Sequence, residues 1–145
     1  MQRFKFSLES LLKVRHMHEE QAQLHLSRSI MLLKSEQLRL KEIVQYAANT
    51  REEWQQALSE KKKIDDFILY SSYLHKLTVQ RDNQQLEVEK AAQFNKECLF
   101  TYSEALKKRK IVERLKEKKR QQHYCESLAE EQKFLDELGT QRYHR

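Results

Sequence analysis

The residues of this chain that could bind a metal ion lie near its N-terminus. His16, His18 and Glu19 fall within four positions, and a helix binds zinc through two histidines four residues apart when a glutamate follows the first. The position four residues after His18 is Ala22, so the second ligand is missing. His16 and His18 are two residues apart and would point to different sides of a helix. We therefore expect no metal site and no cofactor.

A second candidate for chemistry is the basic segment 107–120, in which nine lysines and arginines stand against two glutamates. These charges could neutralise several phosphates, and nucleic-acid binding of that kind would weaken steeply with salt. No aromatic residue is interleaved to stack on bases. A solvated surface, or one complementary to an acidic protein, is therefore favoured over a nucleic-acid partner. The basic patch consists of Lys107, Lys108, Arg109, Lys110, Arg114, Lys116, Lys118, Lys119 and Arg120.

The composition argues against a catalytic fold. The 145 residues include one glycine and no proline, so phosphate loops and the turns of a sheet protein have few residues to build them. A chain that is 39% hydrophobic and 34% charged fills a thin two-helix seam rather than a thick core. Such a seam encloses no dry pocket for a small-molecule substrate. We expect a nearly all-helical protein that is not an enzyme.

The cysteines and the hydrophobic segments indicate the cellular compartment of the protein. Cys98 and Cys125 are expected to be free thiols packed along a helical seam in a reducing environment. The sequence contains no run of about 18 apolar residues, the length needed to span a membrane. Glu9 and Lys13 interrupt the leucines near the N-terminus, so no signal peptide is predicted. These features predict a cytosolic protein.

Apolar residues recur about every 3.5 residues through the first half of the chain, which predicts a long helix that carries His16, His18 and Glu19. Ten of the fifteen positions in this pattern are apolar, which is typical of a coiled-coil seam. The polar positions Arg15, Glu19, Ser29 and Glu36 predict a loosened seam. The positions are Leu8, Leu12, Arg15, Glu19, Ala22, Leu26, Ser29, Leu33, Glu36, Leu40, Ile43, Ala47, Thr50, Trp54 and Ala57. A returning seam is predicted through Val88, Ala91, Cys98, Tyr102, Ala105 and Val112, and later through Tyr124, Leu128, Leu135 and Leu138.

A change of pattern near the middle of the chain predicts a turn. Three lysines at 61–63 suit the end of a helix, and Asp65 or Asp66 suits the N-cap of another. The predicted fold is all-α, a long antiparallel two-helix coiled coil or helical hairpin with its turn near residues 60–68. It forms one domain over 1–145. The first arm covers about 7–60, the turn about 61–66, the second arm about 67–138 with Gly139 ending the helix, and a frayed tail 139–145. A break at residues 47–50 would instead give a bundle of three or four helices.

Aromatic residues leave two interpretations open at each end of the predicted hairpin. Phe4 and Phe6 either dock into a partner or fold back on the seam as a hydrophobic staple. Apolar residues crowd the helical turns after the predicted turn, with Tyr46 and Trp54 near the far end of the first arm. They form either a protein-binding patch or a local cluster that locks the turn. The crowded residues are Phe67, Ile68, Leu69, Tyr70, Tyr73, Leu74 and Leu77.

Two motifs resemble those of a known family. Phe4-Lys5-Phe6-Ser7-Leu8-Glu9-Ser10-Leu11-Leu12-Lys13-Val14-Arg15, followed by Glu19-Glu20-Gln21, resembles the N-terminal signature of the FliJ family of the bacterial flagellar export apparatus. Glu131-Gln132-Lys133-Phe134-Leu135-Asp136-Glu137, followed by Arg142, is similar to that family's closing motif. The resemblance covers the whole chain.

The resemblance implies a non-catalytic stalk similar to that of the rotary ATPase gamma subunit. Members sit in the centre of the hexameric flagellar export ATPase and contact the membrane export gate and export chaperones, which places them in the cytoplasm at the inner membrane of the flagellar base. By this analogy, the ring-binding residues are Phe4, Phe6, Leu8, Leu11, Leu12, Leu135 and Leu138, and the gate-binding residues are Tyr46, Tyr73 and Leu77. The equivalent stalk of a virulence secretion system remains an alternative, as does a coiled-coil nucleic-acid-binding protein.

Overall fold

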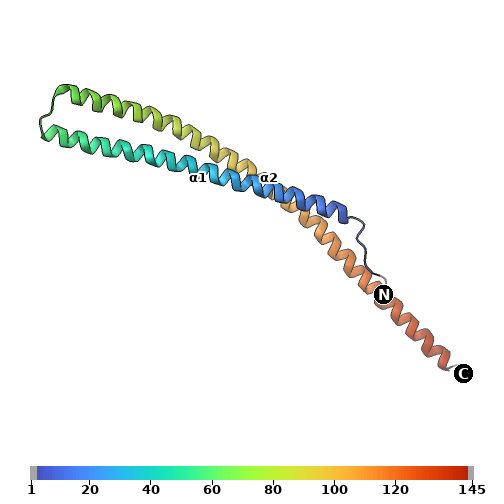
Figure 1. Cartoon of the computed structure of the whole chain (residues 1–145). Coiled ribbons are helices and arrows are strands. Elements are labelled where there is room, and N and C mark those ends of the chain that lie inside the picture. Colours follow the sequence, from blue (N-terminus) through green and yellow to red (C-terminus); the bar gives the residue numbers. More distant parts are fainter. Residues whose placement is uncertain (1–2, 144–145) are drawn as a thin grey trace. The chain divides into compact units, whose positions relative to one another are not determined.

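The computed structural model describes residues 3–143, which form two helices joined by a short turn (Figure 1). Helix α1 spans Glu9–Ser59 and helix α2 spans Ile64–Tyr143. Residues 3–143 include no strand, and the two helices pack antiparallel against each other. The predicted all-α helical hairpin is therefore confirmed. In this part of the chain no helix is long and apolar enough to cross a membrane.

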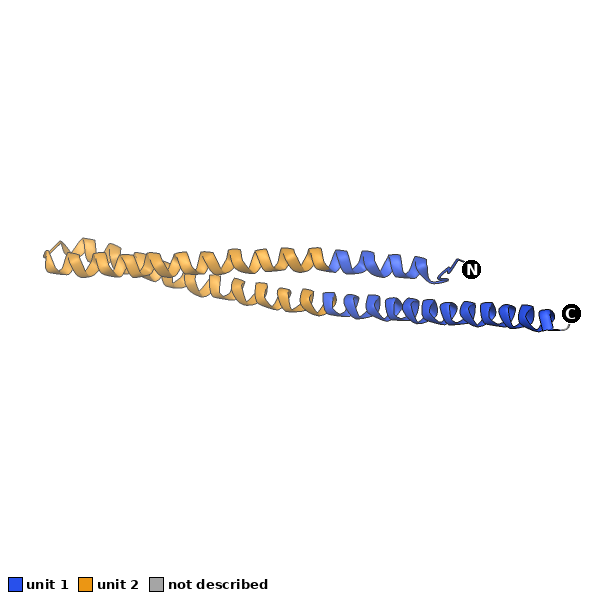
Figure 2. Cartoon of the chain, turned by 90° about the horizontal axis from the view of Figure 1, so that it is seen from below, with its two compact units in different colours: residues 1–22, 102–145 blue, residues 23–101 orange. Residues whose placement is uncertain are grey.

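The contacts divide the chain into two compact units (Figure 2). Unit 1 comprises Met1–Ala22 and Tyr102–Arg145, and unit 2 comprises Gln23–Thr101. Each unit therefore holds part of α1 and part of α2. The sequence predicted one coiled-coil domain over residues 1–145.

The seam predicted for α1 is the buried face of that helix. From Leu12 to Ser59, every seam position is buried or half-buried and every other residue is exposed. Leu8, the first predicted position, precedes the helix and is exposed. Small residues such as Ala22, Ser29 and Ala57 are among the most buried. Small side chains let the two helix backbones approach closely, so the seam is thin, as the composition indicates.

The seam of α2 follows its prediction only as far as Val112. The predicted positions from Val88 to Val112 are buried or half-buried, and Cys98 is a free thiol within this seam. Beyond them the half-buried residues are Glu113, Lys116, His123 and Ser127, whereas Tyr124, Leu128, Leu135 and Leu138 are all exposed. The later part of the predicted seam is thus wrong, because Tyr124 lies on a different side of α2 from His123 and every residue from 128 to 143 is exposed. Cys125 is also exposed rather than packed in a seam.

The turn between the helices occupies residues 60–63, inside the predicted interval near residues 60–68. The N–H of Lys62 donates to the carbonyl of Ala57 (3.4 Å), and Lys61 between them has a φ of 54°. A left-handed residue and a hydrogen bond spanning five residues are the marks of a Schellman motif, which normally has glycine at the left-handed position. Asp65 and Asp66, predicted as N-caps, instead lie in the first turn of α2. Their carboxylates still favour the positive end of the helix dipole there.

Both helices continue past positions at which the sequence suggested a break or an end. The alternative break at residues 47–50 does not occur, since α1 continues to Ser59. The prediction that Gly139 ends the second helix is wrong, because α2 continues to Tyr143. Gly139 does not adopt a positive φ, and nothing lies within 4 Å of the position that its Cβ would occupy. A helical glycine weakens a helix by only about 1 kcal/mol, and no proline follows to stop this one.

We predict that Lys61→Gly stabilises the hairpin. A lysine at positive φ is strained, and glycine removes that strain at some cost in the entropy of the unfolded chain, which leaves a net gain of about 0.5–1 kcal/mol. Urea unfolding followed by circular dichroism measures this gain. The matched control is Lys62→Gly, since Lys62 is not left-handed and its replacement should be neutral or slightly destabilising. Equal effects of the two variants would contradict the strain at Lys61.

Candidate interaction surfaces

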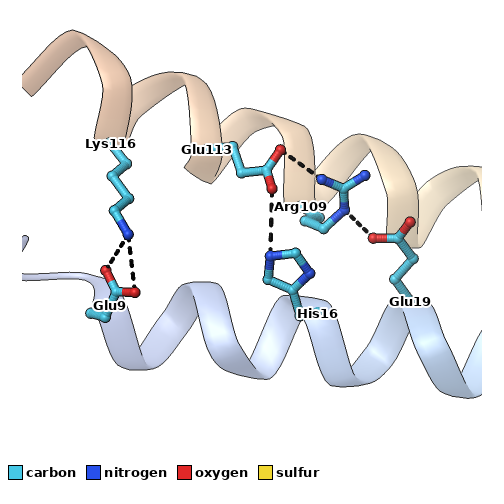
Figure 3. Close-up of polar contacts among 6 residues, drawn as sticks. All are labelled: Glu9, His16, Glu19, Arg109, Glu113 and Lys116. Carbon is cyan, nitrogen blue, oxygen red and sulfur yellow. Dashed lines mark hydrogen bonds and ion pairs between the residues drawn. The ribbon is translucent and has the colours of Figure 1, made fainter. Parts of the chain in front are cut away.

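Polar side chains of α1 and α2 are paired across the seam of unit 1 (Figure 3). Arg109 of α2 is largely buried and donates to Glu19 of α1, while its Nη1 lies 2.6 Å from Oε2 of Glu113. Nε2 of His16 lies 3.4 Å from Oε1 of the same Glu113. Seven residues after Arg109, Nζ of Lys116 lies 2.8 Å from Oε2 of Glu9. A carboxylate of α1 therefore faces each of the two basic side chains that enter this seam.

The carboxylates around Arg109 strengthen its charged state. Hydrogen bonding to Glu19, and then to Glu113, raises the pKa of the Arg109 guanidinium above its ordinary value, against a smaller opposing effect of burial. A raised folded pKa stabilises the protein below the unfolded pKa, and the gain is lost only as pH rises through the folded value. For arginine this window lies in strongly alkaline solution. Arg109 therefore stays charged at every pH at which the protein would be handled.

In unit 2, two polar seam residues of α1 form hydrogen bonds to α2 in which at most one of the two partners is charged. Ser29 is 0% exposed and donates through Oγ to the carbonyl of Leu26 (2.7 Å), while Nδ2 of Asn95 donates to the same Oγ (3.1 Å). Nε2 of Gln84 donates to the backbone carbonyl of Glu36 (3.0 Å) and also to its carboxylate. A buried polar group without such a partner would cost free energy. These two contacts therefore fix how α1 and α2 align within the unit.

Sequence reasoning found one half of these pairs and missed the other. It identified Glu19, Ser29 and Glu36 as weak points of the α1 seam, but not their partners on α2. The signal was present, because Asn95 and Arg109 lie in the same heptad row as Val88, Tyr102 and Lys116. One weak point stays without compensation among the described residues. Nε of Arg15 is buried there and has no hydrogen-bond partner.

The residues assigned to ATPase-ring binding all lie in unit 1. Phe4 and Phe6 are half-buried, and the ring of Phe4 is tilted by 58° against that of His123 at a centroid distance of 5.6 Å. The N-terminal segment thus lies against α2, and Leu8 and Leu11 stay partly exposed beside it. Leu12 is buried in the seam.

The two ring-binding residues of α2 lie in a fully exposed stretch of that helix. Every residue from 128 to 143 is exposed, including Leu135 (60%) and Leu138 (44%). This part of α2 therefore has no packing partner among the described residues.

The residues assigned to gate binding lie in unit 2. Tyr46 (56% exposed) and Tyr73 (44%) are on the surface, whereas Leu77 is 4% exposed and belongs to the seam. A broad open depression of ≈ 820 Å³ beside the turn is lined by Leu69, Tyr70 and Tyr73 together with charged residues of the turn. Ile64, Ile68 and Leu69 are also exposed. The apolar residues after the turn are thus largely on the surface.

The basic patch divides into neutralised and free cations. Arg109 and Lys116 are turned toward carboxylates of α1, and Lys107 and Arg120 pair with Glu104 (3.1 Å) and Glu117 (4.0 Å) of their own helix. The remaining cations are exposed and form no ion pair within residues 3–143. They are Lys108, Lys110, Arg114, Lys118 and Lys119.

The histidines near the N-terminus form no metal site in the described part of the chain. Residues 3–143 contain no group of three or more His, Cys, Asp or Glu side chains arranged to hold a metal ion. His16 instead contacts Glu113 across the seam.

Comparison with known proteins supports the resemblance seen in the sequence. The sequence profile of the flagellar FliJ protein family matches residues 4–145. Among solved structures, that of CT670 from Chlamydia trachomatis, a proposed YscO homologue, is similar with a TM-score of 0.57. The match covers 98% of this chain and 96% of that one at 17% identity, so it bears on the fold alone. No curated protein sequence matches the chain.

We predict that Glu19→Lys lowers the midpoint of thermal unfolding by several degrees, because it places a second cation beside the largely buried Arg109. Glu19→Gln should lower the midpoint less, since the amide oxygen still accepts a hydrogen bond from the guanidinium. Glu20→Lys is the control, because it makes the same charge change at the neighbouring exposed position. If both lysine variants unfolded at the same temperature, the pairing of Glu19 with Arg109 would not contribute to stability.

Proposed function

Because the chain belongs to the flagellar FliJ family, we propose that it is a non-catalytic coupling protein of the flagellar protein export ATPase. It promotes assembly and turnover of the hexameric ATPase ring and links the ring to the membrane export gate and to export chaperones. Its place is the cytoplasmic side of the inner membrane at the base of the flagellum. The family match across residues 4–145 carries this proposal.

The exposed end of unit 1 is the surface proposed to enter the ring. A helix of 80 residues that leaves its last sixteen described residues without a packing partner has apolar side chains available for another protein. Leu135 and Leu138 lie on one side of this stretch, three residues apart, as helix-in-groove anchors do. Phe4, Phe6, Leu8 and Leu11 supply the N-terminal part of the same surface. Buried Leu12 supports them from the seam.

Exposed aromatic residues near the turn of unit 2 are proposed to bind the export gate. Tyr46 and Tyr73 offer a large apolar ring and a hydroxyl each, the combination that is enriched in protein interfaces. Leu77 acts differently, since a buried seam residue supports the surface without touching a partner in this conformation. The depression lined by Leu69, Tyr70 and Tyr73 would accept a side chain of the gate.

Hydrolysis by the export ATPase of the same organism tests the proposal. Titration of the ATPase with this chain should raise the rate of ATP hydrolysis, and the effect should saturate when each ring holds one chain. Sizing of the mixture should show the ring assembling at the same ratio. Stimulation of a virulence-system ATPase, with none of the flagellar enzyme, would favour the alternative secretion system. A chain that neither binds nor stimulates either ATPase would overturn the coupling function.

We predict that the double variant L135N/L138N loses most of the stimulation of ATP hydrolysis and keeps its helicity. Both leucines are exposed, so asparagine removes apolar contact area without opening a cavity. The control is Leu38→Asn, a replacement of an exposed leucine in unit 2 that should leave stimulation unchanged. Equal stimulation by all these variants would remove the last turns of α2 from the ring-binding surface.

We predict that Y46A/Y73A weakens binding to the cytoplasmic domain of the gate protein at nearly unchanged unfolding free energy. Leu77→Ala should instead lower that free energy by about 2 kcal/mol or more, because it leaves a cavity in the seam. Calorimetric titration measures binding, and urea unfolding measures stability. Gate binding that survives in Y46A/Y73A would rule out this aromatic surface as the gate site.

A further inference from the structure

A strip of cations runs along α2 of unit 1, on the side turned away from α1. Lys110, Arg114 and Lys118 are four residues apart, and Lys107 precedes them by three. With about 3.6 residues per turn, these positions lie on one side of the helix, within about 80° of one another. All four are exposed, and the seam residues Arg109 and Val112 lie on the other side. We refer to these four residues as the cationic strip.

Three of the four cations in the cationic strip are not neutralised by their own helix. Of the two glutamates on this side, Glu104 pairs with Lys107 (3.1 Å) and Glu117 lies 4.0 Å from Arg120. Lys110, Arg114 and Lys118 form no ion pair within residues 3–143. Three full charges therefore stand in a row at intervals of about 6 Å, given a rise of about 1.5 Å per residue.

Exposed apolar residues continue the same side of α2 after the cationic strip. Leu128 lies fourteen residues, two heptads, after Arg114, and Tyr124 lies one turn before it. Both are exposed, and so is Ile111 at the edge of the strip. The carboxylates of the following segment, Glu126 and Glu130, lie about 160° from Leu128 around the helix. One side of α2 thus combines cations with apolar side chains, and Glu126 and Glu130 lie behind it.

We propose that this side of α2, from Lys107 to Leu128, binds the surface of a bilayer that contains anionic phospholipids. A helix binds a membrane interface when its apolar side chains enter the boundary between headgroups and acyl chains and its basic residues are attracted to anionic lipids. Each lysine or arginine near such a surface gains from the negative potential of the headgroups. Leu128 and Tyr124 reach the boundary between headgroups and acyl chains, where tyrosine is enriched.

A bilayer fits this face better than the other anionic partners. A nucleic acid would meet cations but no aromatic side chain between them for base stacking. An acidic helix would need carboxylates spaced to match all three free cations. Lipid headgroups are mobile and adapt to the existing spacing, and the same bilayer also accommodates the apolar residues that follow. The proposed face contains none of the residues assigned to the ATPase ring.

Vesicle binding by the full chain tests the proposal without the ATPase. The chain should co-sediment with vesicles of phosphatidylglycerol and phosphatidylcholine at low salt, and should remain in solution with vesicles of phosphatidylcholine alone. High salt should weaken the binding. The variant K110Q/K118Q should lower the partition coefficient by about 30-fold, since each lysine contributes about fivefold. Leu128→Asn should lower it further at any salt concentration.

The matched control is K108Q/K119Q. It makes the same change in net charge with two exposed lysines that lie off the strip and form no ion pair within residues 3–143. It should retain most of the binding. Equal losses in the two double variants would overturn a face-specific contact. Failure to bind anionic vesicles, or displacement from them by duplex DNA through the same lysines, would overturn the lipid assignment. Circular dichroism verifies that each variant is as helical as the parent.

Discussion

Two helices share one seam, and the described part of this protein has no other place to bury a side chain. A polar seam position of α1 therefore costs free energy unless it has a partner, and Glu19, Ser29 and Glu36 have theirs on α2. The small residues Ala22, Ser29 and Ala57 bring the helices close together but bury little apolar area. Hydrogen bonds and ion pairs between the helices compensate for the small apolar area that is buried. The Ser29–Asn95 and Glu19–Arg109 pairs would both be broken if the helices slipped by one heptad, so they select the alignment as well as stabilise it.

Because the seam is only one row wide on each helix, most side chains are on the surface. Interaction surfaces on this fold are accordingly stretches of exposed helix, and they differ from one another in chemistry rather than in shape. The last turns of α2 offer leucines, the residues around the turn offer tyrosines, and the outer side of α2 in unit 1 offers cations. Each surface is exposed without any rearrangement of the seam. The proposed contacts with several partners are compatible with such independence, since binding at one surface does not require unpacking at another.

The same narrow seam explains which sequence predictions succeeded. In α1 the apolar period and the packed face coincide for fourteen consecutive positions, because α2 lies opposite all of them. In α2 they coincide only up to Val112. Tyr124, Leu128, Leu135 and Leu138 keep an apolar helical spacing, but they lie on a side that α1 does not cover. The spacing of apolar residues predicts that a helix has an apolar side, but it does not predict whether another segment packs against that side. Gly139 failed as a helix stop for a related reason, since no left-handed residue is needed where no turn is made.

The amino-acid sequence by itself determined the fold class, the antiparallel hairpin, the approximate turn and the buried face of α1. These follow from helix period, the absence of proline and the lysines at 61–63, which are local properties of the chain. Only the tertiary structure decided which charges are used internally. The heptad row places Arg109 and Lys116 at seam positions, but only the packing of α1 shows that carboxylates lie opposite them. The physical reason is that a charge is neutralised by what lies within a few ångströms of it, and these neighbours come from about a hundred residues away in the chain.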